Sequence, residues 1–236
     1  MFKAILTYDG TRYFGWQKTR AGPSIQEEIE KALLQITGER ATPEAASRTD
    51  RGVHAEGQVI QFALKNPPPP HRLLKALNAV LPTDLRILEI TPCEFHPTLD
   101  AIGKEYHYRL SLTPVQEPTD RLYAWHIPYS LDRQAIERAA QALLGTHDFS
   151  AFANQGEKGI CTLSSIYLEQ DRFYIRGTRF LYKMVRNLVG TLLYIGLGKI
   201  LPSAMAEILA SHDRKKSGLT APAHGLYLHQ VFYPLN

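Results

Sequence analysis

The segment Ser47-Arg48-Thr49-Asp50-Arg51-Gly52-Val53-His54 holds the residues with the clearest capacity for chemistry. It places one carboxylate, Asp50, between two arginines and just before a turn-forming Gly52. Nearby positive charge favours the ionised form of a carboxylate, and glycine lets the backbone bend sharply or approach another molecule closely. A solvated ion pair in a surface turn would use the same residues, since such pairs are common and weak. The segment by itself leaves a catalytic carboxylate and a surface turn open.

A metal site is a second chemistry that this segment could support. Asp50 and His54 are four residues apart and would share one face of a helix as two ligands. Gly52 and Val53 between them disfavour a helix, so we expect no metal here. The sequence also shows no glycine-rich phosphate loop and no cluster of ligand residues, and we therefore expect no cofactor.

The composition is that of a globular protein with a mild positive charge. Of its 236 residues, 44% are hydrophobic and 21% are charged, which suits one large or two small domains. The net charge of +4 is compatible with a nucleic-acid partner but does not require one. Two cysteines without C-x-x-C spacing, a start without signal-peptide layout and the lack of a membrane-length apolar run predict a cytoplasmic location without membrane attachment.

The first hundred residues carry strand and helix signals in the order β-α-β-β-α-β. Hydrophobic periodicity predicts strands near 2–9, 41–46, up to 64 and 85–90, and helices near 25–36 and 71–80. Ser24-Ile25-Gln26-Glu27 has the form of a capping box, and Gly38 is placed to end the first helix. Between strand and helix, an aromatic loop at 13–17 is either a contact surface or a local core. The order is that of a ferredoxin-like α+β unit, so we expect a first domain over 1–98.

Residues 99–236 are predicted to form a second α+β domain, again a mixed sheet backed by helices. Strands are expected near 101–112, 163–168, 172–176 and 226–233, and helices near 133–145, 180–195 and 203–210, with a mobile loop at 154–159 and a basic turn at 212–216.

Two patterns in this second half concern charged residues. Alternation puts Lys104, Tyr106 and Tyr108 on one face of the strand at 101–112. The helix at 180–195 carries one narrow basic stripe, which is either a solvated face or the floor of a cleft. The stripe follows helical spacing through four residues: Arg179, Lys183, Arg186 and Gly190.

Six motifs in order resemble the tRNA pseudouridine synthase A family over nearly the whole chain. They are Tyr8-Asp9-Gly10-Thr11 with Gly15-Trp16-Gln17, Ser24-Ile25-Gln26-Glu27, Arg48-Thr49-Asp50-x-Gly52-Val53-His54-Ala55, Tyr106-x-Tyr108, Phe180-Leu181-x-x-Met184-Val185-Arg186-Asn187, and Ala221-Pro222-x-x-Gly225-Leu226-Tyr227-Leu228. The resemblance implies two ferredoxin-like or RRM-like domains side by side, edging a central basic cleft. It implies isomerisation of uridine to pseudouridine in the anticodon stem-loop of tRNA, no cofactor, and a homodimer that holds the tRNA.

The resemblance also implies roles for single residues. Asp50 would be the catalytic carboxylate and Arg186 its ion-pair partner. Tyr106 would stack on the flipped-out uracil, since a base must leave its stack before an enzyme can work on its glycosidic bond. Arg48 would help to extrude or replace that base. Three further residues are candidate RNA contacts: Arg51, His54 and Lys183.

Some matters stay open at this point. Ser47 and Arg51 stand where the family has small residues, and the segment before Ile166 lacks an expected basic residue. Whether Asp50 adds to the ribose, adds to the base or removes a sugar proton is not defined by the motifs. Two rival functions are a non-catalytic tRNA-binding protein of the same architecture and a metal-dependent nuclease that uses Asp50 with histidines.

Overall fold

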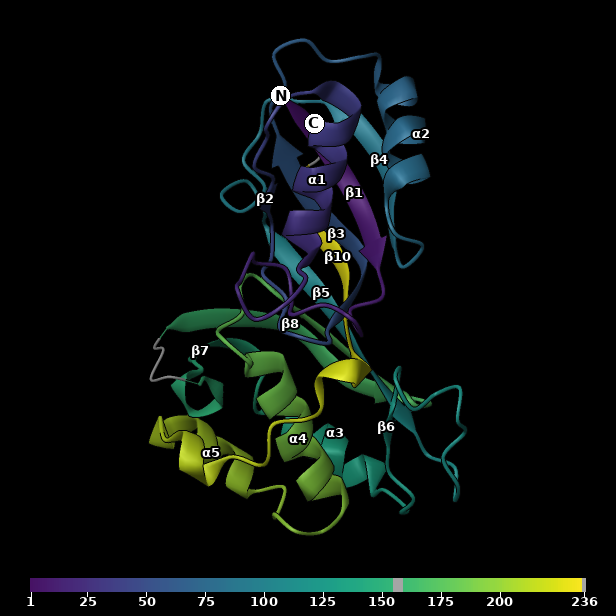
Figure 1. Cartoon of the computed structure of the whole chain (residues 1–236). Helices are drawn as coiled ribbons and strands as arrows, with labels where there is room; N and C mark the ends of the chain where they lie inside the picture. The colour runs from purple at the N-terminus through teal and green to yellow at the C-terminus, as the bar shows by residue number, and fades with distance from the viewer. Residues whose placement is uncertain (155–158, 235–236) are drawn as a thin grey trace. The chain divides into compact units, whose positions relative to one another are not determined.

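The chain folds into two compact units, each of which joins a β-sheet to helices (Figure 1). The computed structural model describes residues 1–154 and 159–234. Unit 1 consists of residues 1–102 and the strand that runs on from 227, and unit 2 consists of residues 103–226. This division differs from the expected domains, 1–98 and 99–236, because the last strand returns to unit 1. The predicted α+β class is confirmed.

The sheet of unit 1 has the ferredoxin-like arrangement that the element order predicts. Its strands are β1 (Phe2–Tyr8), β2 (Glu44–Ala45), β3 (His54–Phe62), β4 (Leu85–Pro92) and β10 (Leu226–Phe232). The order β4-β1-β3 is antiparallel throughout, and β2 pairs antiparallel with the far edge of β3. The first strand therefore lies inside the sheet, with its alternate residues buried.

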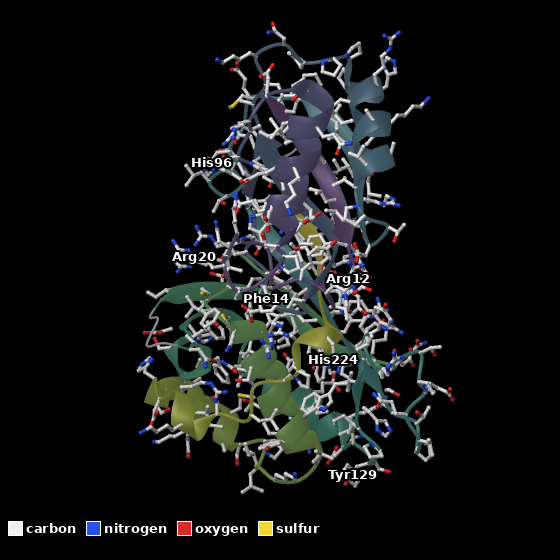
Figure 2. The ribbon with its side chains drawn as sticks, in the orientation of Figure 1. Arg12, Phe14, Arg20, His96, Tyr129 and His224 are labelled. Carbon is white, nitrogen blue, oxygen red and sulfur yellow. The ribbon has the colours of Figure 1, made fainter. Side chains whose placement is uncertain are left out.

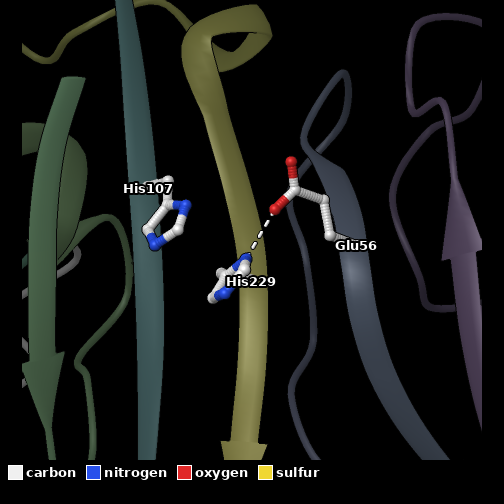
Figure 3. A group of neighbouring side chains, drawn as sticks. All are labelled: Glu56, His107 and His229. Carbon is white, nitrogen blue, oxygen red and sulfur yellow. Dashed lines mark hydrogen bonds and ion pairs between the residues drawn. The ribbon is translucent and has the colours of Figure 1, made fainter.

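The far edge of β3 is shared by two partners, which explains why the last strand belongs to unit 1. β2 pairs with one end of this edge, and β10 pairs parallel with the other, at His54 and Ala55. A Cβ on Gly57 would lie 2.4 Å from the carbonyl oxygen of His229, so only glycine permits this approach. Beside it, Nδ1 of His229 lies 2.6 Å from Oε2 of Glu56 (Figure 3).

Two helices complete unit 1, and both begin and end much as the sequence predicts. Helix α1 (Ile25–Thr37) starts where Ser24 accepts a hydrogen bond from the Glu27 amide, and Gly38 ends it with φ 72°. Helix α2 (Pro70–Val80) begins with a proline in its first turn. The two helices bury aliphatic side chains at helical spacing: Ile25, Ile29, Leu33, Leu73 and Leu77.

Unit 2 contains a second sheet and three α-helices. Its strands are β5 (Gly103–Ser111), β6 (Trp125–His126), β7 (Gly145–Asp148), β8 (Ile160–Glu169) and β9 (Arg172–Gly177). The sheet order is β5-β9-β8-β7 with antiparallel neighbours, and β6 lies parallel to β5. The helices are α3 (Arg133–Gln141), α4 (Met184–Gly196) and α5 (Ala204–Ser211), with short 3-10 turns η1 (Ser150–Phe152), η2 (Arg214–Lys216) and η3 (Ala223–Gly225).

Two helix boundaries in unit 2 differ from the prediction. Helix α3 ends at Gln141, and Gly145 (φ 94°) begins strand β7 instead of stopping the helix. Helix α4 begins at Met184 because Lys183, with φ 60°, has left-handed backbone that a right-handed helix cannot include. Residues 155–158 of the expected loop lie outside the described residues.

The prediction of a basic stripe along this helix is therefore wrong. Arg179 and Lys183 precede α4, so that only Arg186 and Gly190 of the four residues share the helix. Gly190 also has a packing role, since its Cβ would lie 1.8 Å from the carbonyl oxygen of Leu219. The chain at 218–221 thus contacts the helix backbone directly.

Within the described residues, no helix combines the length and apolar character needed to cross a bilayer. The longest described helices, α1 and α4, have 13 residues each, whereas a span takes about 20.

Gly190→Ala tests the contact between α4 and the chain at 219. Helix propensity by itself would make the alanine variant more stable by about 0.5–1 kcal/mol. The steric clash with the Leu219 carbonyl should instead lower the free energy of unfolding by about 1–3 kcal/mol. Urea denaturation measures the sign, and an alanine variant more stable than the parent protein would contradict the described contact.

Candidate active site

Asp50 lies in a tight turn between β2 and β3 of unit 1. The amide of Val53 donates to the Asp50 carbonyl over 3.1 Å, and Gly52 has φ 78°, which favours glycine. The side chain of Asp50 is half-buried, while Thr49 before it and Val53 after it are buried. The turn therefore fixes the backbone of Asp50 and leaves its carboxylate partly accessible.

The aromatic loop at 13–17 holds this turn from one side. The amide of Trp16 donates to the Thr49 carbonyl over 3.0 Å, and the Gly52 amide donates to the Tyr13 carbonyl over 3.3 Å. A Cβ on Gly15 would lie 2.4 Å from the Thr49 carbonyl oxygen, so the two backbones touch. Tyr13 and Trp16 are buried, which shows that these two aromatics form a local core rather than a contact surface.

Strand side chains hold the turn from the other side. Gln58 on β3 donates to the Ser47 carbonyl over 2.6 Å and accepts from the Ser47 amide over 3.3 Å. The Tyr8 hydroxyl on β1 lies 2.9 Å from Oγ1 of Thr49. Burial raises the pKa of Tyr8 to about 12, and its hydroxyl therefore keeps its proton at neutral pH. The residues before Asp50 are thus tied directly to the sheet.

The two arginines that flank Asp50 are both exposed. The guanidinium carbon of Arg51 lies 4.1 Å from the ring centroid of Phe14, which Figure 2 labels. Such cation–π contacts contribute about 0.5–1 kcal/mol at exposed sites. Arg48 and Arg51 thus remain accessible to a large ligand.

His54, predicted as an RNA contact, is instead a buried residue. Only 2% of it is exposed, and its ring stacks on Tyr227 of β10 at a centroid distance of 4.7 Å. The Gly10 amide donates to Nδ1 over 3.1 Å, so this nitrogen acts as an acceptor. Oδ1 of Asp9 also lies 3.2 Å from Nδ1, but it already accepts two hydrogen bonds from Thr11. His54 therefore links β10 to the loop after β1, which favours a structural role.

In unit 2, Tyr106 lies on the face of β5 that also carries Tyr108. Tyr106 is 6% exposed and contacts Phe180 edge to face, with centroids 5.0 Å apart and planes at 80°. Tyr108 donates from its hydroxyl to the Pro222 carbonyl over 2.8 Å. Tyr106 and Tyr108 are thus held by the segments before and after α4.

Arg186 lies in the first turn of α4 and is tied to Ala221 in both directions. Nε of Arg186 donates to the Ala221 carbonyl over 2.7 Å, and the Ala221 amide donates to the Arg186 carbonyl over 3.1 Å. Because the Nε bond fixes the plane of the guanidinium, the direction of its terminal nitrogens is fixed too.

The next residue, Asn187, is fully buried and organises the surroundings of Arg186. Its Nδ2 donates to the Phe152 carbonyl over 2.7 Å. Its Oδ1 accepts from Nη2 of Arg214 over 2.9 Å and from Oγ1 of Thr220 over 2.7 Å. Arg214 also donates to the Gly218 carbonyl, so this part of the predicted basic turn supports the chain at 217–220.

The predicted residues fall into two sets. Arg48, Asp50, Arg51 and His54 belong to unit 1, whereas Tyr106, Lys183 and Arg186 belong to unit 2. Lys183, directly before α4, has its Nζ 5.0 Å from the ring centroid of Tyr182.

Sequence reasoning assigned no role to the side chains that position these sets. Among them are Tyr8, Gln58 and Asn187, which hold the backbones at 47–49 and 186–187. The sequence does hint at them, because each is a polar residue at a position where the strand or helix periodicity predicts a buried side chain. Such groups need internal hydrogen-bond partners.

Comparison with known proteins gives one consistent result. A family model described as "tRNA pseudouridine synthase" matches residues 4–97 and 139–234. The chain is 47% identical to tRNA pseudouridine synthase A 2 of Protochlamydia amoebophila (strain UWE25), covering 98% of this chain and 93% of the relative. It is 42% identical to tRNA pseudouridine synthase A of Thermoanaerobacter sp. (strain X514), covering 97% and 98%. A relative of the same name from Chlamydia trachomatis serovar A (strain ATCC VR-571B / DSM 19440 / HAR-13) is 43% identical, covering 97% and 90%.

Gln58→Leu tests the support beneath the Asp50 turn. The substitution leaves the Ser47 amide and carbonyl without their side-chain partner, which should lower the free energy of unfolding by about 1–3 kcal/mol. Gln61→Leu on the same strand is the matched control, since Gln61 does not touch the turn; we expect a change within about 0.5 kcal/mol. Equal effects of the two variants in urea denaturation would contradict a specific role for Gln58.

Proposed function

Because this chain belongs to the tRNA pseudouridine synthase family, it is an isomerase that converts uridine in tRNA to pseudouridine, and we propose that its targets lie in the anticodon stem-loop. The main evidence for this reaction is that 98% of this chain aligns with a tRNA pseudouridine synthase at 47% identity. The support for the anticodon arm is the run of six motifs that resemble synthase A, together with relatives that carry that name.

The chemistry of the reaction limits what the protein must supply. The glycosidic bond between C1′ and N1 of uridine breaks, the uracil turns, and C1′ bonds to C5. A proton leaves C5 and N1 carries a proton in the product, so substrate and product contain the same atoms. No electron is gained or lost. The protein therefore needs to supply three kinds of group for this reaction: a carboxylate, a counter-charge, and side chains that hold the base out of its stack.

We propose that Asp50 is the catalytic carboxylate of this reaction. Its support is a turn that fixes the backbone on both sides of Asp50 while its side chain stays half-buried. A catalytic group must be held close to its productive geometry, and bonds from Trp16 and Gln58 to the neighbouring residues serve that purpose.

Arg186 and Tyr106 are the proposed partners of Asp50 in the reaction. An ionised carboxylate in a desolvated site needs a positive counter-charge, and Arg186 is held by Ala221 in a fixed direction. Tyr106, held edge-to-face by Phe180, offers an aromatic side chain for the extruded uracil. Arg48, Arg51 and Lys183 are proposed RNA contacts.

Two further assignments rest on family resemblance. We propose that the enzyme is a homodimer, as the synthase A motifs imply. We also propose that it acts in the cytoplasm, because its substrate is tRNA. Analytical ultracentrifugation of the purified chain and cell fractionation test these assignments separately.

Asp50→Asn should abolish pseudouridine formation and leave tRNA affinity within about threefold, because the amide keeps the shape but loses the charge on which the chemistry depends. The measurement is pseudouridine mapping on an unmodified tRNA transcript with EDTA present, beside a filter-binding assay. Asp171→Asn, an exposed carboxylate in the β8–β9 hairpin, is the matched control and should keep full activity. Wild-type protein that binds tRNA tightly without product would favour the non-catalytic alternative, and chelator-sensitive cleavage would favour a nuclease.

Arg186→Met should lower kcat by about 100-fold or more, because the developing charge at the reaction centre loses its counter-charge. Affinity for tRNA should fall by about threefold or less, since a single cation contributes little to a large RNA interface. The control is Arg138→Met, which removes an exposed arginine from α3. If kcat and affinity fall by the same factor in Arg186→Met, Arg186 is a phosphate contact rather than the partner of Asp50.

A further inference from the structure

Lys104 is a cation on a face of the sheet where cations are uncommon. Strand β5 pairs in continuous register with β9, so that Lys104 lies opposite Gly177, Tyr106 opposite Ile175 and Tyr108 opposite Phe173. Residues paired in this way point to the same face. All members of this set except Lys104 are buried: Tyr106, Tyr108, Phe173, Ile175 and Gly177. Lys104 therefore lies at the end of the core-facing row and is itself half-buried.

The segment after β9 closes around Lys104. A Cβ on Gly177 would lie 3.3 Å from Cζ of Phe180, so Phe180 covers the position opposite Lys104. Phe180 also contacts Tyr106 edge to face at 5.0 Å. Arg179, directly before Phe180, is a second, exposed cation, and its positive charge acts on Lys104. Lys104, Arg179 and the proposed base-stacking Tyr106 thus share one end of the face.

The positive charge of Lys104 has no compensating carboxylate within residues 1–154 and 159–234. The structure shows neither a hydrogen bond nor an ion pair of its ammonium group among them. Glu105, the adjacent acid, points to the opposite face, where its Oε1 lies 2.9 Å from Nε2 of His107. Burial, and next the charge of Arg179, lower the pKa of Lys104 from 10.5 to about 8.

This arrangement opposes folding rather than supporting it. A lysine whose pKa is lower in the folded than in the unfolded chain binds its proton less tightly when folded. The protonated group therefore destabilises the fold at all pH values below the folded pKa. That penalty disappears only as the pH rises through the interval between about 8 and 10.5. A cation kept at a cost to stability, beside a second cation, is what a site for an anionic ligand requires.

We propose that Lys104, with Arg179 beside it, binds a phosphate group of the RNA backbone next to the nucleotide whose base lies against Tyr106. The inference rests on the proposed role of Tyr106. An ammonium is a suitable phosphate ligand because it acts as a compact point charge with three donors. Since residues i and i+2 of a strand lie about 6.6 Å apart, the side chain of Lys104 reaches the backbone of a nucleotide held at Tyr106.

The alternative is that Lys104 only covers the end of the core with its aliphatic stem. The two roles differ in their effect on tRNA binding. Lys104→Met keeps the stem and removes the charge, so both roles predict a higher Tm at pH 7, since the buried ammonium lowers stability in either case. A phosphate-binding role predicts weaker tRNA binding, whereas a covering role predicts unchanged tRNA binding.

The experiment measures tRNA affinity against salt concentration for the full-length protein and three variants. Lys104→Met should weaken binding by about tenfold at 0.1 M salt and reduce the slope of log Kd against log salt by about 0.7–0.9, as for one lost phosphate contact. Lys104→Arg should keep both values near those of the wild type. Lys199→Met, which removes an exposed lysine of unit 2, is the matched control. An unchanged salt slope in Lys104→Met would overturn the proposal.

A second arm locates the anion on the RNA. Anticodon stem-loops are made with one neutral methylphosphonate linkage each, placed in turn around the target uridine. At one linkage, the neutral group should weaken wild-type binding by about tenfold and leave Lys104→Met unaffected, since charge and partner are removed together. If the wild type and the variant respond alike at every linkage, no phosphate pairs with Lys104. Both arms measure binding, so they give an answer even where pseudouridine mapping shows that the wild type makes no product.

Discussion

The backbone contact between the loop at 13–17 and the Asp50 turn is the constraint on which the proposed site depends. A turn has no ladder of its own, so its peptide groups must find partners elsewhere. Here the Thr49 carbonyl and the Gly52 amide bond to the loop, which in turn is anchored by the buried Trp16. The two backbones can meet only because Gly15 has no side chain. The position of the carboxylate is thus determined by main-chain geometry, which varies less than side-chain geometry.

Unit 2 uses the same physical solution for Arg186. There the chain at 218–221 lies directly on α4, and Gly190 permits the contact. The two bonds between Arg186 and Ala221 and the buried Asn187 then fix the guanidinium. In both units a charged residue lies at or next to a contact between peptide backbones: Asp50 directly follows Thr49, and the carbonyl of Arg186 itself accepts from the Ala221 amide.

The sequence predicted those features of the fold that depend on residues close together in the chain. The cap of α1 at Ser24, its end at Gly38 and the β-α-β-β-α-β order of unit 1 all follow from residues close together in the chain. The predicted start of α4 was wrong because the composition of residues 180–183 suits a helix. The left-handed backbone of Lys183, which excludes these residues from the helix, depends on contacts made by distant segments. The burial of His54 depends in the same way on Tyr227, which lies far along the chain. For Lys104 the shared face with Tyr106 was readable from alternation, but its burial and its lack of a carboxylate partner were not.

The return of β10 to unit 1 has a consequence for the order in which the protein can form. Ribosomes release the chain from its N-terminus, so residues 103–226 all emerge before β10 exists. Until then the edge of β3 at His54 and Ala55 is unoccupied, and the ring of His54 has no Tyr227 to stack on. Unit 2, an uninterrupted segment, can fold during synthesis, whereas unit 1 is completed only at the end. Nascent chains that stall before 227 would therefore present an open strand edge, the kind of surface that chaperones bind and that aggregates grow from.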